Sequence, residues 1–241
     1  MHDHRRDHPQ PQSLDCIAAT RLVLAAAALL AAVPAPAQVN ASIALASEYS
    51  ARGVSLSDGQ AAPQLSLGYD AASGWYTGLF ASRAVLRDRG GDTVLMAYGG
   101  YSGRLASGLN WEAGASSTTF HRAAEYNYRE VYAGLAGDLL SARLYLAPSY
   151  YGYAGRAAYA EINGFYPLYE RLKLIGHVGT LRPLRSAGVR ARDTVDLRLG
   201  LGLDLDHYNL QLAWQASTVD GGRIAGQAAP RQLSLSAAYS F

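Results

Sequence analysis

The chain has 241 residues, of which 49% are hydrophobic and only 17% are charged, and its formal net charge is +2. The small net charge argues against nucleic-acid binding, which needs a clustered basic surface, and the low charge content argues against a disordered chain. A single cysteine excludes a disulfide framework and a cysteine-based zinc site. The 25 glycines and 17 tyrosines, beside only 4 phenylalanines and 2 methionines, are typical of a chain of short strands.

The N-terminal segment predicts export. Residues 22–33 (LVLAAAALLAAV) are all apolar, Arg21 precedes them, and an Ala-x-Ala sequence ends at Ala37. Twelve residues are too few for a membrane-spanning helix, which needs about 20, and a buried core helix would show an amphipathic period. A basic flank, a short apolar core and small residues before a cleavage site define a secretory signal peptide. We therefore expect cleavage after Ala37, which removes residues 1–37 and leaves 38–241 as the mature domain.

The mature domain alternates between apolar and polar residues. In residues 195–205 valine and leucine occupy every odd position, whereas aspartate, arginine and glycine occupy the even ones. Residues 208–216 and 232–241 repeat the pattern. A strand sorts such residues onto two faces, whereas a helix would spread them around its surface. A sheet that crosses a membrane must also close on itself, because lipid offers no hydrogen-bond partner to an open edge.

Twelve such segments predict the fold. They lie near residues 41–53, 63–71, 75–85, 93–103, 109–119, 127–137, 142–153, 157–167, 171–181, 194–205, 208–218 and 231–241. Short and long connections alternate along the chain, as in outer-membrane barrels. A soluble β-sandwich also alternates, but it explains neither these loop lengths nor the aromatic residues at the strand ends. The latter predict interfacial aromatic girdles, made of Trp75, Tyr76, Tyr101, Tyr126, Tyr128, Tyr150, Tyr151, Tyr208 and Trp214. The sequence thus predicts an all-β fold, a transmembrane antiparallel up-and-down β-barrel of about 12 strands, in the outer membrane of a Gram-negative bacterium.

Two stretches resemble known sequence signals. The chain ends in Tyr239-Ser240-Phe241, which resembles the C-terminal aromatic-x-Phe signal that outer-membrane barrels present to the barrel-assembly machinery. Residues 47–55 (SEYSARGVS), with Asp58-Gly59 and residues 74–82, resemble the start of a family of uncharacterised Gram-negative outer-membrane proteins, with Phe80 in place of a tryptophan. This resemblance covers mainly residues 45–82. It implies the barrel fold but no activity, because the family has none established.

The inward face is predicted to carry the charged residues. Its acids would be Glu48, Glu112, Glu130, Glu161, Asp196 and Asp204, and its bases Arg143, Lys173 and Arg198, with His177 near mid-height and Arg52 near the rim. These residues could line a narrow porin-like channel for small solutes. They could equally form ion pairs that seal a structural or surface-interaction barrel. Eight strands give a filled interior and about sixteen a channel, so twelve leave both alternatives open. If the lumen conducts, six acids against three bases predict weak cation selectivity.

Other function classes find little support. The histidines of the mature domain are His121, His177 and His207, and neither Gly-x-Ser-x-Gly nor His-Glu-x-x-His occurs, so we expect no enzyme, no metal and no cofactor. Segment 182–193 contains four arginines, which could bind lipopolysaccharide phosphates or could form a solvated loop. The expected partners are outer-membrane lipids, lipopolysaccharide, the barrel-assembly machinery and, for a conducting lumen, small solutes; nucleic acid is not expected.

Overall fold

The computed structural model describes residues 38–241 with gaps at 87–89, 151–154, 185–192, 219–226 and 229–230. The predicted signal peptide, residues 1–37, lies outside the described residues, as do Tyr151 and most of the arginine-rich segment. In the part of the chain that is described, no helix is long and apolar enough to cross a membrane.

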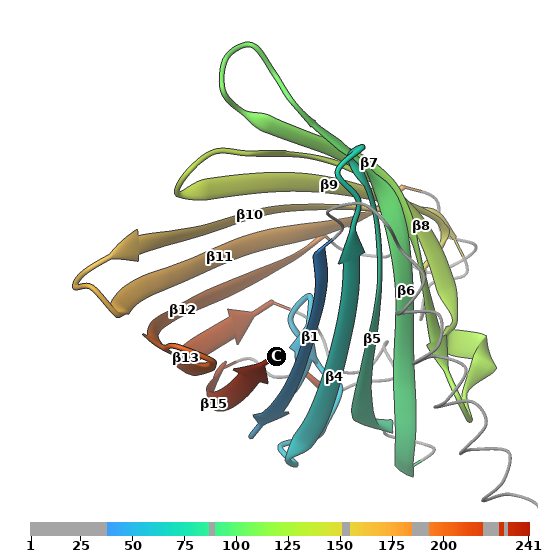
Figure 1. The fold of residues 1–241 in the computed structure, drawn as a ribbon. Coiled ribbons are helices and arrows are strands. Elements are labelled where there is room, and N and C mark those ends of the chain that lie inside the picture. The colour runs from blue at the N-terminus through green and yellow to red at the C-terminus, as the bar shows by residue number, and fades with distance from the viewer. Residues whose placement is uncertain (1–37, 87–89, 151–154, 185–192, 219–226, 229–230) are drawn as a thin grey trace, which may run out of the picture. The chain divides into compact units, whose positions relative to one another are not determined.

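Twelve strands in the described residues form one closed antiparallel barrel, which confirms the predicted fold class. They are β1 (Gln38–Ala46), β4 (Ala62–Asp70), β5 (Trp75–Leu86), β6 (Gly90–Arg104), β7 (Asn110–Phe120), β8 (Tyr128–Ala136), β9 (Leu140–Ser149), β10 (Ala157–Pro167), β11 (Leu172–Pro183), β12 (Thr194–Leu205), β13 (Tyr208–Ser217) and β15 (Arg231–Ser240). Each strand pairs with the next along the chain, and β15 closes the barrel on β1 (Figure 1). A 3-10 turn, η1 (Ala124–Tyr126), precedes β8.

The alternation predicted from sequence separates an apolar outer wall from a polar lumen. On β12 the leucines point outward, and Leu199 remains 54% exposed, whereas Asp196 on the other face is buried. A soluble sandwich would bury such leucines in its core. An apolar outer band with a polar interior is the arrangement of membrane-spanning barrels.

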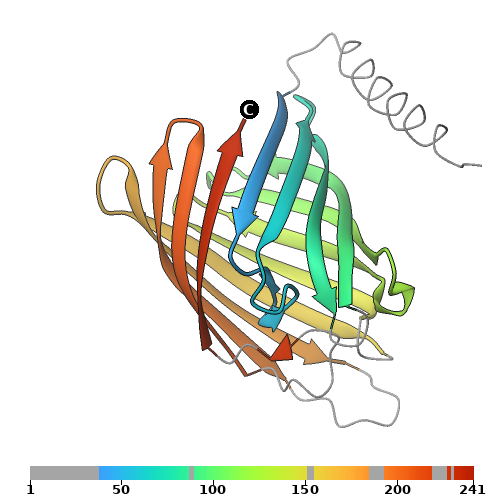
Figure 2. The same cartoon turned by 90° about the horizontal axis from the view of Figure 1, so that it is seen from below.

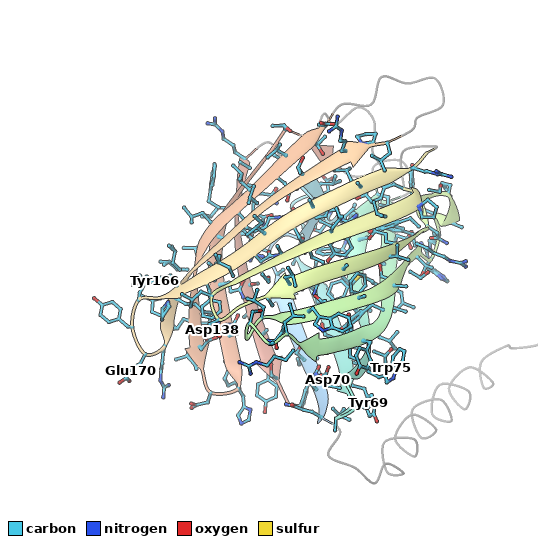
Figure 3. All side chains as sticks on the ribbon, turned by 90° about the horizontal axis from the view of Figure 1, so that it is seen from above. Tyr69, Asp70, Trp75, Asp138, Tyr166 and Glu170 are labelled. Atoms are coloured by element: carbon cyan, nitrogen blue, oxygen red, sulfur yellow. The ribbon has the colours of Figure 1, made fainter. Side chains whose placement is uncertain are left out.

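The connections differ at the two ends of the barrel. Short turns follow β4, β6, β8, β10 and β12 at the end where β1 begins and the chain terminates, which we call the turn end (Figure 2). The longer connections lie at the opposite end, the loop end. Figure 3 labels Tyr69, Trp75 and Tyr166 around the turn end, where Trp75 contacts Tyr101 edge to face with 5.3 Å between ring centroids. Of these aromatic residues, Trp75 and Tyr101 belong to the predicted interfacial girdle.

Several aromatic residues predicted for the girdle lie elsewhere. Tyr76 points into the lumen, where its hydroxyl bonds Glu112. Tyr126, Tyr128 and Tyr150 pack against the apolar cluster at the loop end. Strand-end position alone does not reveal which face of the wall an aromatic residue occupies, because one residue of difference in register reverses the face.

Inward glycines make room for inward tyrosines. Gly78 pairs with Tyr98 and Gly100 pairs with Tyr76 across β5 and β6, and Gly114 on β7 pairs with Tyr132 on β8. At Gly78, Gly100 and Gly114 a side chain would collide with the partner ring. The glycines therefore allow the rings to lie flat along the wall, which gives this side of the lumen a tyrosine lining.

The first predicted strand, 41–53, is too long, and its last part folds inward. β1 ends at Ala46, and residues 47–59 form a separate hairpin that we call the luminal hairpin (Figure 2). Its two short strands, β2 (Ser50–Ala51) and β3 (Val54–Ser55), are joined by Arg52 and Gly53, whose φ angles are 51° and 75°. Positive φ at both central residues is the requirement of a type I′ hairpin turn, which alternation of polarity does not reveal.

The luminal hairpin is built into the loop end of the barrel. β3 pairs with β14 (Gln227–Ala228), which belongs to the connection between β13 and β15. Val54 and Leu56 pack with Leu86, Val94 and Phe120 in a buried cluster. The backbone amide of Val85 donates to the carbonyl of Leu56 at 2.6 Å. Pairing and packing together hold the hairpin in place.

Candidate functional site: the lumen

The tip of the luminal hairpin is tied to the opposite wall by an ion pair. The Arg52 guanidinium donates to both carboxylate oxygens of Glu130 on β8, at 2.7 and 2.8 Å. The side chains of Arg52 and Glu130 are only 13% and 4% exposed. The guanidinium also lies 4.3 Å from the ring centroid of Tyr159 and 4.8 Å from that of Tyr145. The prediction placed Arg52 near the rim on a continuous first strand; in the structure the hairpin turn carries it into the lumen at the loop end.

Arg52 lies outside the barrel strands and keeps its charge. Burial alone would lower the pKa of its guanidinium, but the Tyr150 hydroxyl and the hydrogen-bonded Glu130 carboxylate raise that pKa well above its ordinary value. A charged guanidinium with a bidentate carboxylate partner is among the stronger hydrogen-bonded pairs in proteins. The pair therefore acts as a fixed crosslink between the hairpin and β8.

Glu48, predicted to line the pore, stabilises the hairpin instead. Its carboxylate accepts hydrogen bonds from the Ser55 hydroxyl at 2.5 Å, the Ser50 hydroxyl at 3.2 Å and the Gly59 amide at 2.7 Å. The residue is buried. The prediction assumed that β1 continued to residue 53, whereas the strand ends before Glu48.

Glu112 and Arg143 form the second luminal pair. The Arg143 Nη2 and Nε atoms lie 2.5 and 2.8 Å from Oε1 of Glu112. Tyr76 donates to the other oxygen of Glu112 at 2.9 Å, and Arg143 donates to the hydroxyl of Tyr145 at 2.9 Å. Both charges predicted for these positions do face the lumen, but each neutralises the other.

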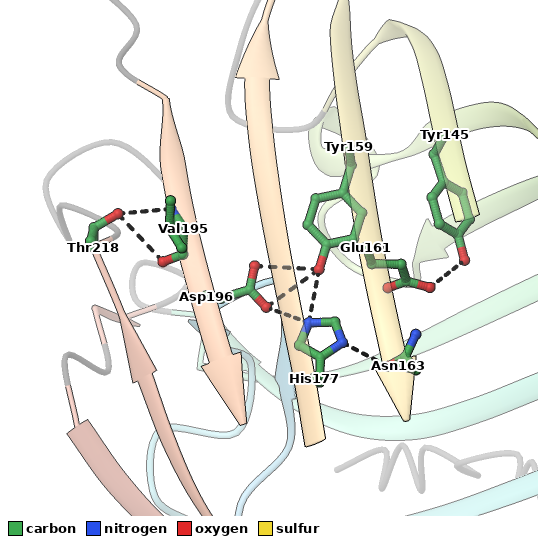
Figure 4. A network of polar contacts seen from close by, with 8 residues as sticks. All are labelled: Tyr145, Tyr159, Glu161, Asn163, His177, Val195, Asp196 and Thr218. Atoms are coloured by element: carbon green, nitrogen blue, oxygen red, sulfur yellow. Dashed lines mark hydrogen bonds and ion pairs between the residues drawn. The ribbon is translucent and has the colours of Figure 1, made fainter. Parts of the chain in front are cut away.

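A third cluster surrounds His177 (Figure 4). Its Nε2 atom lies 2.8 Å from Oδ1 of Asp196 and 3.2 Å from the hydroxyl of Tyr159, and its Nδ1 atom lies 2.7 Å from Oδ1 of Asn163. Glu161 lies beside this cluster and accepts a bond from Tyr145 at 3.2 Å. The register brings these residues together, because β10, β11 and β12 are adjacent strands.

The remaining predicted bases are Lys173, near the turn end, and Arg198, near the middle of β12. Lys173 pairs with Asp204 at 2.8 Å, and Asn209 donates to the other oxygen of the same carboxylate at 2.5 Å. Arg198 differs, because its Nη2 atom donates to the neutral side chain of Gln211 at 2.9 Å. Its buried Nε atom has no hydrogen-bond partner among the described residues.

Three cavities follow one another through the lumen. The first, of about 340 Å³, lies at the turn end and is bordered by Lys173, His177 and Arg198. The second, of about 290 Å³, shares His177 and Arg198 with the first and extends to Arg52. The third, of about 490 Å³, shares Arg52 with the second and is lined by the tyrosine wall. The tip of the hairpin thus separates the second cavity from the third.

Some sequence predictions concern residues at the edge of the described structure. In segment 182–193 the exposed Arg182 lies 3.8 Å from Asp193, and the other three arginines lie outside the described residues. At the end of the chain, the Phe241 amide donates to the carbonyl of Ala41 at 3.0 Å, and its ring meets that of Tyr239 edge to face. Within the described residues no group of three acidic, histidine or cysteine side chains could hold a metal ion.

Sequence reasoning missed the luminal roles of Arg52, Tyr76 and Tyr159. The alternation of β10 does place Tyr159 on the same face as Glu161 and Asn163, so this signal was present in the sequence. No comparable signal existed for Arg52, whose position depends on the inward fold of its whole segment.

Two solved porin structures share this fold. The KdgM porin, in complex with disordered oligogalacturonate, matches with a TM-score of 0.53 and 11% identity over 84% of this chain and 98% of that one. The NanC porin matches with a TM-score of 0.53 and 10% identity over 85% of this chain and 99% of that one. At such identities the likeness shows the fold alone. No curated protein sequence matches the chain, whereas a family profile described as a bacterial protein of unknown function, Gcw_chp, matches residues 31–236.

Proposed function

The chain belongs to the bacterial family of unknown function Gcw_chp, and we propose that it is a narrow outer-membrane channel for small solutes. The observation that carries this proposal is the series of three luminal cavities, each of which shares lining residues with the next. A barrel that served only as a scaffold would have no need of such a series. The fold shared with two porins supports the same class of function.

The luminal hairpin sets the proposed size limit. It places Arg52 and Gly53 across the lumen, between Glu130 on β8 and Ser217 on β13. A side chain at Gly53 would collide with Ser217 and Asp196, so the tip touches the wall on that side. Solutes must therefore pass the ion pair of Arg52 and Glu130, and we expect a small conductance.

The proposed location follows from the same architecture. The apolar outer wall requires a bilayer, the proposed signal peptide 1–37 directs export, and the terminal Phe241 would present the assembly signal. With short turns on the periplasmic side, as is usual for such barrels, the hairpin would lie near the outer surface, where lipopolysaccharide is the neighbouring lipid. The proposed role is transport and involves no catalysis.

A sealed barrel is the second candidate, and one observation favours it. Three contacts hold the hairpin against the rest of the chain: the pair of Arg52 and Glu130, the pairing of β3 with β14, and the hydrogen bond from the Val85 amide to the Leu56 carbonyl. A hairpin held this firmly could close the lumen permanently. The barrel would then act through its loop end, as a structural or surface-interaction protein.

Recording in planar bilayers separates the two candidates. We compare the native barrel with a variant in which a Gly-Ser linker of equal length replaces residues 48–59, after confirming on gels that both are folded and heat-modifiable. A channel gives a small native conductance that increases in the variant. A native barrel that stays silent while the variant conducts would show that the lumen is sealed. Silence of both folded proteins would contradict the channel proposal.

A further inference from the structure

Within the described part of the chain, Arg198 is a partly buried luminal base that lacks an acidic partner. Among the described residues, Arg52 pairs with Glu130, Arg143 with Glu112 and Lys173 with Asp204. Arg198 has the neutral Gln211 as its hydrogen-bond partner, and its Nε atom has none. A partly buried guanidinium without a carboxylate is costly unless something compensates its charge.

The acids near Arg198 are already engaged. Asp196, two residues earlier on the same face of β12, contacts both His177 and Tyr159. Asp204, farther along that face, is held by Lys173 and Asn209. His177, which is paired with Arg198 across β11 and β12, is itself bound to Asp196 and Asn163. The local network therefore leaves a positive charge on Arg198.

Arg198 also occupies a particular place in the lumen. It borders both the first cavity, of about 340 Å³, and the second, of about 290 Å³. A solute that moves between them must pass its side chain. The first cavity lies at the lower end of the size range of small-ligand sites, which is roughly 300–1,000 Å³.

We propose that Arg198 binds the carboxylate of a small anionic solute where the first and second cavities meet. The inference rests on the proposed channel for its physiological meaning. A guanidinium presents a planar set of donors that matches a carboxylate in bidentate fashion. Asn163 and Gln211 border the same first cavity and can hydrogen-bond the uncharged hydroxyl groups of such a solute.

Other charges around the junction indicate on which side of Arg198 the solute carboxylate should lie. Glu161 lines the second cavity without an ionic partner among the described residues and would repel an anion there. Asp138 borders the first cavity at its mouth, in the turn between β8 and β9. The solute carboxylate should therefore lie on the first-cavity side of Arg198. The weak cation selectivity expected from six acids and three bases is thereby replaced by a preference for anions at this junction.

Calorimetry on the detergent-purified barrel tests the site without any need for conduction. The probe is glucuronate, and glucose serves as the matched neutral sugar. We expect glucuronate to bind better than glucose, and Arg198→Gln to weaken glucuronate binding about tenfold or more, with glucose unaffected. Arg198→Lys should retain part of the affinity, because lysine keeps the positive charge but cannot bind a carboxylate in bidentate fashion.

A second arginine provides the control. Arg83→Gln removes the same charge from the outer face of β5, where Arg83 bonds Gln60 and the Ala61 carbonyl, and it should leave binding unchanged. Equal affinity of native protein and R198Q for glucuronate, or no glucuronate binding at all, would overturn the inference.

Reversal potentials in a KCl gradient supply the second measurement. R198Q should shift selectivity toward cations relative to native protein, whereas R83Q should not. If the barrel conducts but R198Q changes neither its selectivity nor its glucuronate binding, the channel proposal stands and the Arg198 site is refuted. A barrel that binds glucuronate through Arg198 but never conducts would refute the channel and preserve the site.

Discussion

Arg52 and Glu130 join the tip of the luminal hairpin to β8 through two hydrogen bonds of 2.7 and 2.8 Å, although 78 positions separate them in the sequence. The pair lies between the second and third luminal cavities. It therefore couples two properties of the protein, the stability of the loop end and the width of the lumen.

Glu130→Gln should destabilise the barrel by about 3–5 kcal/mol, because it leaves the buried Arg52 without its counter-charge. Urea unfolding followed by tryptophan fluorescence measures the change. Arg171→Gln is the control, since the pair of Arg171 and Asp206 is 3.7 Å apart and its side chains are 57% and 81% exposed. That substitution should cost no more than about 1 kcal/mol. Equal effects of the two variants would contradict a structural role for the Arg52 pair.

Glu112→Gln should have a smaller effect on stability than Glu130→Gln. The Glu112–Arg143 pair is more exposed to the lumen than the Arg52 pair, so we expect a loss of about 1–3 kcal/mol.

In a conducting barrel the double variant E112Q/E130Q should shift the reversal potential toward anions, because it frees Arg143 and Arg52. Arg198 is not expected to contribute, because among the described residues it pairs with neither acid. A shift toward cations would refute this assignment of pairs.

Gly53→Ala should displace the luminal hairpin. The residue has a φ of 75°, and a side chain there would meet Ser217 and Asp196. Gly59→Ala is the matched control, because Gly59 has a φ of 70° but open space around it. In both variants the free energy of unfolding should fall by about 1–2 kcal/mol, because alanine is strained in the left-handed backbone conformation. In G53A it should fall by about 1–3 kcal/mol more, because the added methyl group overpacks the site. G53A alone should also increase single-channel conductance; indistinguishable variants would argue that the tip does not touch the wall.

Deletion of Phe241 should reduce the amount of folded protein in the outer membrane. The Phe241 amide bonds Ala41 on β1, beside the contact where β15 closes the barrel. Removal of the residue takes away both this bond and the proposed assembly signal. Fractionation and heat-modifiability on gels measure the result. Tyr169→Ala removes another exposed aromatic residue at the turn end and should leave the level unchanged, so a similar loss in both variants would point to a general aromatic effect.

Cleavage of the proposed signal peptide should leave Gln38 as the first residue of the mature protein. The prediction follows from the apolar run 22–33 and the Ala-x-Ala sequence that ends at Ala37. N-terminal sequencing of membrane-extracted protein reads the result directly. Replacement of Ala37 with a bulky residue should cause precursor to accumulate. A mature protein that still contains residues 22–33 would contradict this export route.

The barrel could be predicted from local sequence patterns. The leucines of residues 195–205 and the polar residues between them specify a strand with one apolar face, and repetition over twelve segments specifies a closed wall. This information is local, because the side-chain period of a strand is two residues whatever lies on either side of it. For the same reason the inward positions of Glu112, Glu130, Glu161 and Asp196 could be predicted from their neighbours alone.

The contacts that these inward residues make could not be predicted in the same way, because they depend on how distant segments come together. Polarity continues to alternate past Ala46, yet the left-handed turn at Arg52 and Gly53 sends the chain into the lumen. Each pairing then depends on register between strands and on segments far apart in sequence, so Arg52 meets Glu130 while Arg198 receives no carboxylate. A charge count along the chain predicted an acidic lumen. The three-dimensional arrangement pairs three of those six acids with arginine or lysine, and within the described residues it leaves Arg198 without a carboxylate partner at the junction of two cavities.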